Sequence, residues 1–240
     1  MSPNDQTSTQ QTPSLPAGLH GLASDWASDQ RTFKNVAWGK AMMWIFLLSD
    51  TFIFGCFLLA YMSSRMSTTV PWPNSSEVFA LTIGGHHIPL ILIAIMTFVL
   101  ISSSGTMAMA VNFGYRHDRR KTAALLFATA ALGATFVGMQ ALEWSKLIAE
   151  GVRPWGNPWG AEQFGSSFFM ITGFHGTHVT IGVIFLLIVA RKVLRGDFDK
   201  GRRGFFTSRK GHYEEVEIMG LYWHFVDLVW VFIFAVFYLW

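Results

Sequence analysis

Residues Ile88–Tyr115 read IPLILIAIMTFVLISSSGTMAMAVNFGY, and no charged side chain interrupts them. A helix needs about 20 residues to cross the ~30 Å hydrocarbon core of a bilayer. This stretch is longer than that, and it lacks the alternation of apolar and polar residues that is typical of membrane barrel strands. It therefore predicts a transmembrane helix.

Four further apolar stretches have the length of a membrane span. In lipid, only helices and closed barrels satisfy the hydrogen bonds of the backbone. We therefore expect an all-α fold over residues 37–240, a polytopic membrane bundle of five transmembrane helices. The predicted spans are Trp38–Met62, Ile88–Phe113, Thr122–Ile148, Ser166–Ala190 and Met219–Leu239.

The composition agrees with a membrane protein. Of 240 residues, 51% are hydrophobic and only 14% are charged, against about a quarter charged in an ordinary globular domain. The single cysteine, Cys56, cannot form a disulfide within the chain. Residues 1–36 are polar and rich in Ser, Thr, Gln and Pro, without the apolar core of a signal peptide. We expect a disordered N-terminal tail there, not a cleaved signal.

The basic residues lie in short links between the apolar stretches, which predicts membrane orientation and not nucleic-acid binding. One link, residues 115–121, reads YRHDRRK, and the link at residues 191–210 is also strongly basic. The other two links contain Trp72, Trp155 and Trp159 and few basic residues. By the positive-inside rule the basic links are cytoplasmic, so we expect the N-terminus inside and the C-terminus outside.

Several ionisable or strongly polar residues fall inside the predicted spans or directly before one: Asp50, Gln140, Glu143, His175, His178, Glu217, His224 and Asp227. An ionisable side chain at membrane depth is costly and indicates either a proton or ion site or a contact with a partner. For the histidines we favour hydrogen bonds between helices over a metal site, because no second histidine pair lies within another span. The small residues Gly173, Gly176 and Gly182 predict close helix packing around them.

Two motifs are highly specific. They are Gly173–Val179, GFHGTHV, and Tyr222–Trp230, YWHFVDLVW. Together with the order of Trp38–Gly39, Ser49–Asp50, Pro89–Leu90, Ser102–Ser103, Gln140 and Glu143–Trp144, they resemble subunit III of cytochrome c oxidase, a member of the haem-copper respiratory oxidases. The resemblance covers about residues 36–240.

The resemblance implies a non-catalytic subunit of a proton-pumping terminal oxidase that oxidises cytochrome c and reduces dioxygen to water. It implies the five-helix form, without the two leading helices of the longer form. Its main partner would be subunit I, with subunit II and possibly a small subunit IV. Haems and copper would lie in those partners, and this chain would hold no metal or cofactor, only bound phospholipid. The location would be the bacterial inner membrane, and the role would be to stabilise subunit I and support its proton uptake.

The resemblance also assigns candidate roles to residues. Asp50, Glu143, Glu217 and Asp227 would be proton-related or interface carboxyl groups, and Glu217 matches the family's glutamate at the start of its last helix. The cytochrome c oxidases usually have glutamate where this chain has Asp50, and aspartate is associated with the quinol oxidases. A quinol oxidase subunit, or a homologue associated with nitric oxide reductase, is therefore an alternative. An independent channel or transporter and a membrane metalloenzyme using His175, His178 and His224 are further alternatives.

Overall fold

The computed structural model describes residues 38–74, 78–79, 81–83, 86–88, 90–199 and 213–240. The predicted tail, residues 1–36, lies outside them. In the described part, five long helices follow one another along the chain. They are α2 (Trp38–Ser67), α4 (Ile91–Tyr115), α5 (Arg119–Ala149), α6 (Glu162–Arg195) and α7 (Glu214–Phe234), and a π-helical turn, η1 (Ala235–Leu239), continues α7.

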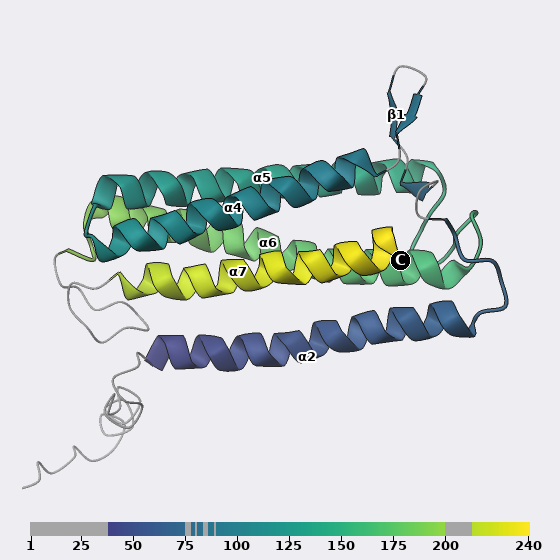
Figure 1. Ribbon diagram of the computed structural model, residues 1–240, viewed down its shortest axis with the longest axis horizontal. Helices are drawn as coiled ribbons and strands as arrows, with labels where there is room; N and C mark the ends of the chain where they lie inside the picture. Colours follow the sequence, from purple (N-terminus) through teal and green to yellow (C-terminus); the bar gives the residue numbers. More distant parts are fainter. Residues whose placement is uncertain (1–37, 75–77, 80, 84–85, 89, 200–212) are drawn as a thin grey trace, which may run out of the picture. The chain divides into compact units, whose positions relative to one another are not determined.

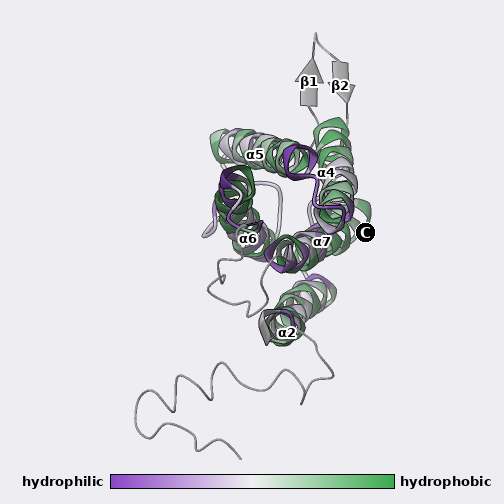
Figure 2. Ribbon diagram, turned by 90° about the vertical axis from the view of Figure 1, so that its left-hand side faces the viewer, coloured by the Kyte–Doolittle hydropathy of each residue, from purple (hydrophilic) through white to green (hydrophobic). Residues whose placement is uncertain are grey.

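Four of these helices form a closed ring, and the fifth lies outside it (Figures 1 and 2). Helix α4 packs against α5, α5 against α6, and α6 against α7, and the contact between α4 and α7 closes the ring. Helix α2 packs on the outside, against α7 and α6. Residues Trp38–Trp240 thus form one compact unit.

All five helices are long and apolar enough to cross a membrane. Hydrophobic residues predominate along each of them (Figure 2). Large apolar side chains also point away from the bundle, for example Leu48, Phe52 and Phe98, which are all more than 70% exposed. An outward apolar surface of this kind suits lipid, so the predicted membrane bundle of five helices is confirmed.

The helices extend beyond the predicted apolar spans. The fourth, for example, runs from Glu162 to Arg195 and not from Ser166 to Ala190. Its end is set by Gly196, which has the left-handed φ of 73° that favours glycine at a helix terminus. Helix α5 begins at Arg119 because the carboxylate of Asp118 accepts a hydrogen bond from the backbone N–H of Lys121. Polar residues at helix ends continue the helix into the lipid headgroup region.

A short antiparallel hairpin is an addition to the predicted all-α fold. Strand β1 (Leu81–Ile83) pairs with β2 (His86–Ile88) in the link between α2 and α4. Ile88 was predicted to begin the second span, but it lies in β2, and α4 begins at Ile91. The physical reason is that a residue before proline, here Pro89, is disfavoured in helical conformation.

The ring encloses large aromatic side chains. Trp223 and Trp230 of α7 and Phe136 of α5 are fully buried, and the rings of Phe136 and Trp230 meet edge to face with centroids 4.7 Å apart. Glycines make room for Trp223. A Cβ at Gly133 of α5 would overlap the indole ring, and a Cβ at Gly182 of α6 would lie 2.9 Å from it.

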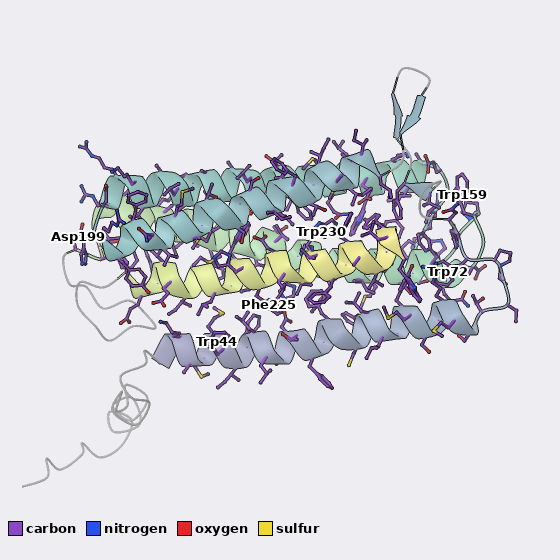
Figure 3. The ribbon with its side chains drawn as sticks, in the orientation of Figure 1. Trp44, Trp72, Trp159, Asp199, Phe225 and Trp230 are labelled. Atoms are coloured by element: carbon purple, nitrogen blue, oxygen red, sulfur yellow. The ribbon has the colours of Figure 1, made fainter. Side chains whose placement is uncertain are left out.

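The basic turn before α5 and the basic end of α6 lie together at one end of the bundle. Asp199 marks this end in Figure 3, whereas Trp72 and Trp159 mark the opposite end. Tyr213, just before α7, donates a hydrogen bond of 3.0 Å to Asp199. Burial, and then the neighbouring carboxylate of Asp199, raise the pKa of the Tyr213 phenol to about 12. The phenol therefore stays neutral. The side chain packs against the turn between α4 and α5 at this end of the bundle.

Candidate functional site

Asp50 and His178 form a buried pair between α2 and α6. Nε2 of His178 lies 3.3 Å from Oδ2 of Asp50, without the alignment of a hydrogen bond. Nδ1 of His178 lies 2.8 Å from the carbonyl oxygen of Phe174, and because a carbonyl oxygen only accepts, Nδ1 carries a hydrogen. Without a further proton, the lone pair of Nε2 would face an ionised carboxylate, which is repulsive. A proton on either group would remove this repulsion between the two helices.

The surroundings of this pair are aromatic. The ring of Phe54 lies 5.7 Å from the imidazole of His178 and 5.2 Å from the ring of Phe174, measured between centroids. The hydroxyl of Tyr222 on α7 donates a 2.9 Å hydrogen bond to the backbone carbonyl of His178. Three helices, α2, α6 and α7, therefore meet at this point, in surroundings where an unpaired charge is costly.

His175 lies one turn before His178 but contacts a different helix. Its imidazole is fully buried, and Nε2 donates to the backbone carbonyl of Val226 on α7 at 3.2 Å. Its other ring nitrogen, Nδ1, has no hydrogen-bond partner. The rings of Phe136 and Trp230 flank it at 5.7 and 5.2 Å. Of the two histidines of the motif, His175 thus contacts α7 and His178 contacts α2.

The three glycines of α6 lie in different surroundings. A Cβ at Gly173 would lie 3.1 Å from the indole of Trp144 on α5, and one at Gly182 would crowd Trp223 and Tyr222 of α7. A Cβ at Gly176 would meet nothing within 4 Å in this chain. The packing role assigned to Gly176 stays a prediction, and it would need a contact outside this chain.

Glu143 belongs to a second buried cluster, near the opposite end of the bundle from the basic links. Its two carboxylate oxygens accept hydrogen bonds from the amide of Gln140 at 2.8 Å and from the hydroxyl of Tyr238 at 3.1 Å. Tyr238 comes from the π-helical turn η1, which lays this side chain into the core. A cavity of about 180 Å³ adjoins the cluster and is lined by Val78, Phe79, Leu92, Ile93, Leu142, Glu143, Lys146 and Leu147.

Hydroxyl groups join α4 to α7 along the membrane interior. The indole N–H of Trp223 donates to Ser103 at 2.9 Å, and the indole N–H of Trp230 donates to Thr97 at 3.0 Å. Next to the first of these contacts, the hydroxyl of Ser104 lies 2.6 Å from Nδ1 of His224. These bonds satisfy the large aromatic and imidazole groups of α7 where no water is available.

Asp227 and Glu217 share a helix but not an environment. Asp227 is 7% exposed, and neither of its carboxylate oxygens has a hydrogen-bond partner among the described residues. Glu217 forms an ion pair with Lys40 at 2.5 Å, which fastens the start of α7 to the start of α2. On the same helix, Glu217 thus contacts α2 and His224 contacts α4.

A family model described as "Cytochrome c oxidase subunit III" matches residues 28–240. The chain belongs to the cytochrome c oxidase subunit III family. This subunit III is therefore a multi-pass membrane protein of the haem-copper oxidases, and membership implies association with other oxidase subunits.

Similar curated proteins carry the name "Probable quinol oxidase subunit 3". This subunit III is 31% identical over 212 residues to the one from Staphylococcus aureus (strain USA300), covering 88% of this chain and 92% of that protein. It is 30% identical over 213 residues to the one from Staphylococcus saprophyticus, with the same coverage. The family match at residues 28–240 covers all five transmembrane helices.

The structure of subunit III brings together only part of the residue set that the sequence singled out. Asp50 meets His178, and Gln140 meets Glu143, whereas His175, His224 and Glu217 each contact a separate group. In the described residues, no three His, Cys, Asp or Glu side chains gather as they would around a metal ion. Sequence reasoning missed Tyr238 and Ser104, because hydroxyl groups within apolar runs are common and carry no signal of depth or direction.

Proposed function

We propose that this chain is the accessory, non-catalytic subunit III of a proton-pumping terminal oxidase. In this role it braces subunit I, supports proton uptake by that subunit and binds phospholipid, and the haems and copper belong to its partners. Subunit II and a small subunit IV complete the proposed complex. Its proposed place is the bacterial inner membrane, which the bacterial origin of the relatives supports.

The observation that carries this proposal is the Asp50–His178 pair. The pair lies between α2 and α6, beside phenylalanine rings, and in our proposal it holds a proton within the bundle. A carboxyl group in such a place can hold helices in register and tune protons nearby. The other buried polar groups, at Glu143 and His175, likewise join two elements each. This pattern suits a brace beside a catalytic subunit.

Removing the subunit from the complete oxidase tests this role. The oxidase is purified with and without this chain, and the haem spectrum, oxygen consumption and time course of inactivation are compared. We expect an unchanged haem spectrum and initial turnover in the depleted enzyme, with slower turnover at high pH and earlier inactivation. Haem bound by the isolated chain, or complete loss of turnover on depletion, would overturn the accessory role.

The electron donor is a second question, on which the relatives bear directly. The resemblance put cytochrome c first and a quinol second, but both named relatives are called quinol oxidase subunits. Aspartate at position 50 points the same way. We therefore favour a quinol as donor to the partner subunits. The purified complex should consume oxygen with a reduced quinol and not with reduced cytochrome c, and the opposite result would restore the first assignment.

A further inference from the structure

One outward face of the bundle combines small residues with polar groups that lack partners. On α4, Ile101, Ser104, Gly105 and Ala108 recur at intervals of three and four and so share one side of the helix. Beside them on α7 lie His224, Leu228 and Val231. These seven residues are called the α4–α7 face below. Helices α4 and α7 are seen side by side in Figure 1.

The polar groups of this face form an incomplete chain of hydrogen bonds. Nδ1 of His224 lies 2.6 Å from the Ser104 hydroxyl, and Nε2 has no hydrogen-bond partner among the described residues. One turn further along α7, the carboxyl group of Asp227 lies near the same hydroxyl, without the alignment of a hydrogen bond. Both carboxylate oxygens are buried, and neither has an aligned donor. Unpaired groups of this kind are expensive at membrane depth, where lipid tails offer no hydrogen bonds.

One missing donor would complete the chain. A donor outside the subunit that bonds Nε2 of His224 would place the ring proton on Nδ1, because a neutral imidazole carries one hydrogen. Nδ1 then donates to the oxygen of Ser104. The Ser104 hydroxyl is freed to donate in turn to Asp227, which gives one of the two buried carboxylate oxygens a donor. A single contact at Nε2 thus determines the hydrogen bonds of the His224 imidazole, the Ser104 hydroxyl and the Asp227 carboxyl group.

We propose that the α4–α7 face receives a transmembrane helix of another oxidase subunit, whose side chain donates a hydrogen bond to Nε2 of His224. The inference rests on the proposed function in that the partner belongs to the same complex. Gly105 and Ala108 permit a close approach of that helix, as small residues do in membranes. A second copy of this chain suits the face poorly, because it would bring a second buried carboxylate that itself lacks a donor, and its own imidazole and hydroxyl are already engaged with each other.

Two glycines give a matched test of this face. Gly105 of α4 and Gly138 of α5 are both exposed, and a Cβ at either would meet nothing within 4 Å in this chain. Phenylalanine at either position should therefore leave the subunit folded. In the complete oxidase purified through a tag on this chain, Gly105→Phe should lower the ratio of haem to subunit III several-fold. Gly138→Phe should match the unsubstituted complex.

Cross-linking identifies the neighbour. A photoreactive residue replaces Ile101 on the face or, as control, Ile184 on α6, two side chains that are 57% and 53% exposed. Irradiation of the complete oxidase should join position 101 to an oxidase subunit identified by mass spectrometry, and position 184 to no oxidase subunit. A cross-link from position 101 to a second copy of this chain, or to lipid alone, would overturn the proposal.

The two hypotheses fail in different ways. If the unsubstituted subunit co-purifies with no haem at all, the proposed function is wrong. If it co-purifies with haem but Gly105→Phe behaves as Gly138→Phe does, the function stands and the assignment of this face is wrong. Folding of each variant is checked by its elution in detergent, and a Gly105→Ala variant, which adds one methyl group, should retain more haem than Gly105→Phe.

Discussion

The contact between Asp50 and His178 is the most informative feature at the scale of single residues. His178 is fixed by its backbone contact at Nδ1, so only Nε2 faces the carboxyl group. The pair is the mid-depth contact of α2 with the ring of helices. We therefore propose two roles for Asp50, as a structural link and as a proton-holding group, and substitutions can separate these.

Asp50→Asn retains a hydrogen-bonding side chain opposite His178 but removes titration of residue 50. We expect an assembled oxidase with normal haem content and a modest loss of turnover that grows at high pH, where proton supply limits the rate. Asp50→Leu should lose more, because it leaves Nε2 of His178 unpaired at a cost of ~1–3 kcal/mol. Oxygen consumption against pH distinguishes the two variants. Complete inactivity of Asp50→Asn with intact haem spectra would contradict an accessory role.

The sequence could predict which ionisable residues matter but not what they contact. Asp50, His175 and Glu143 stand out because charge at membrane depth is rare and costly. Asp50 contacts a histidine of another helix, His175 contacts a backbone carbonyl, and Glu143 contacts a tyrosine from a π-helical turn. Such partners depend on helix rotation and on side-chain direction, which apolar spans with little periodicity do not specify.

At the scale of helices, the indole of Trp223 determines how closely α5, α6 and α7 approach. Its ring fills the space left by Gly133 and Gly182, and its N–H bonds Ser103 of α4. All four helices of the ring therefore meet around one side chain. The glycines near the motif histidines were recognised from sequence, but Gly133 was not, because it lies in an ordinary run of alanines.

A methyl group at Gly133 should disturb this junction. A Cβ there would overlap Trp223 and lie 2.9 Å from Cγ2 of Val183, and overpacking of this kind costs about 1–3 kcal/mol. Gly133→Ala should thus lower the thermal stability of the subunit in detergent. Gly138→Ala on the same helix has open space and should be neutral or stabilising, by up to ~1 kcal/mol from helix propensity. Equal melting temperatures for the two variants would contradict the packing described here.

Boundaries were predicted less well than the helices themselves. Hydropathy locates the part of a helix that lies in hydrocarbon, whereas the helix ends where capping groups or turns stop it. Asp118 and Gly196 are such signals and are readable in the sequence. The hairpin at residues 81–88 was not predicted, because three-residue strands produce no pattern long enough to recognise.

At the scale of the whole molecule, α2 is the helix least embedded in the bundle. Discrete contacts hold it along its length: the Lys40–Glu217 ion pair at one end, Asp50–His178 in the middle, and Arg65 over the ring of Trp240 at the other end. Its remaining surface is apolar and exposed. Helix α2 can therefore contact lipid or a partner while staying fixed to the ring of four.

The orientation of the bundle is testable because its two ends differ in charge. The basic turn before α5 and the basic end of α6 lie together with Asp199, and Trp72 and Trp159 lie at the other end (Figure 3). Lys and Arg are retained on the cytoplasmic side, and Trp prefers the interface. Reporter fusions after Lys121 and after Asp197 should therefore report cytoplasm, and a fusion after Trp240 should report the outer side. The first two fusions control for each other, because an even number of crossings separates them. A cytoplasmic signal from the fusion after Trp240, with the other two unchanged, would mean that α7 does not cross the membrane, and the five-span topology would have to be given up.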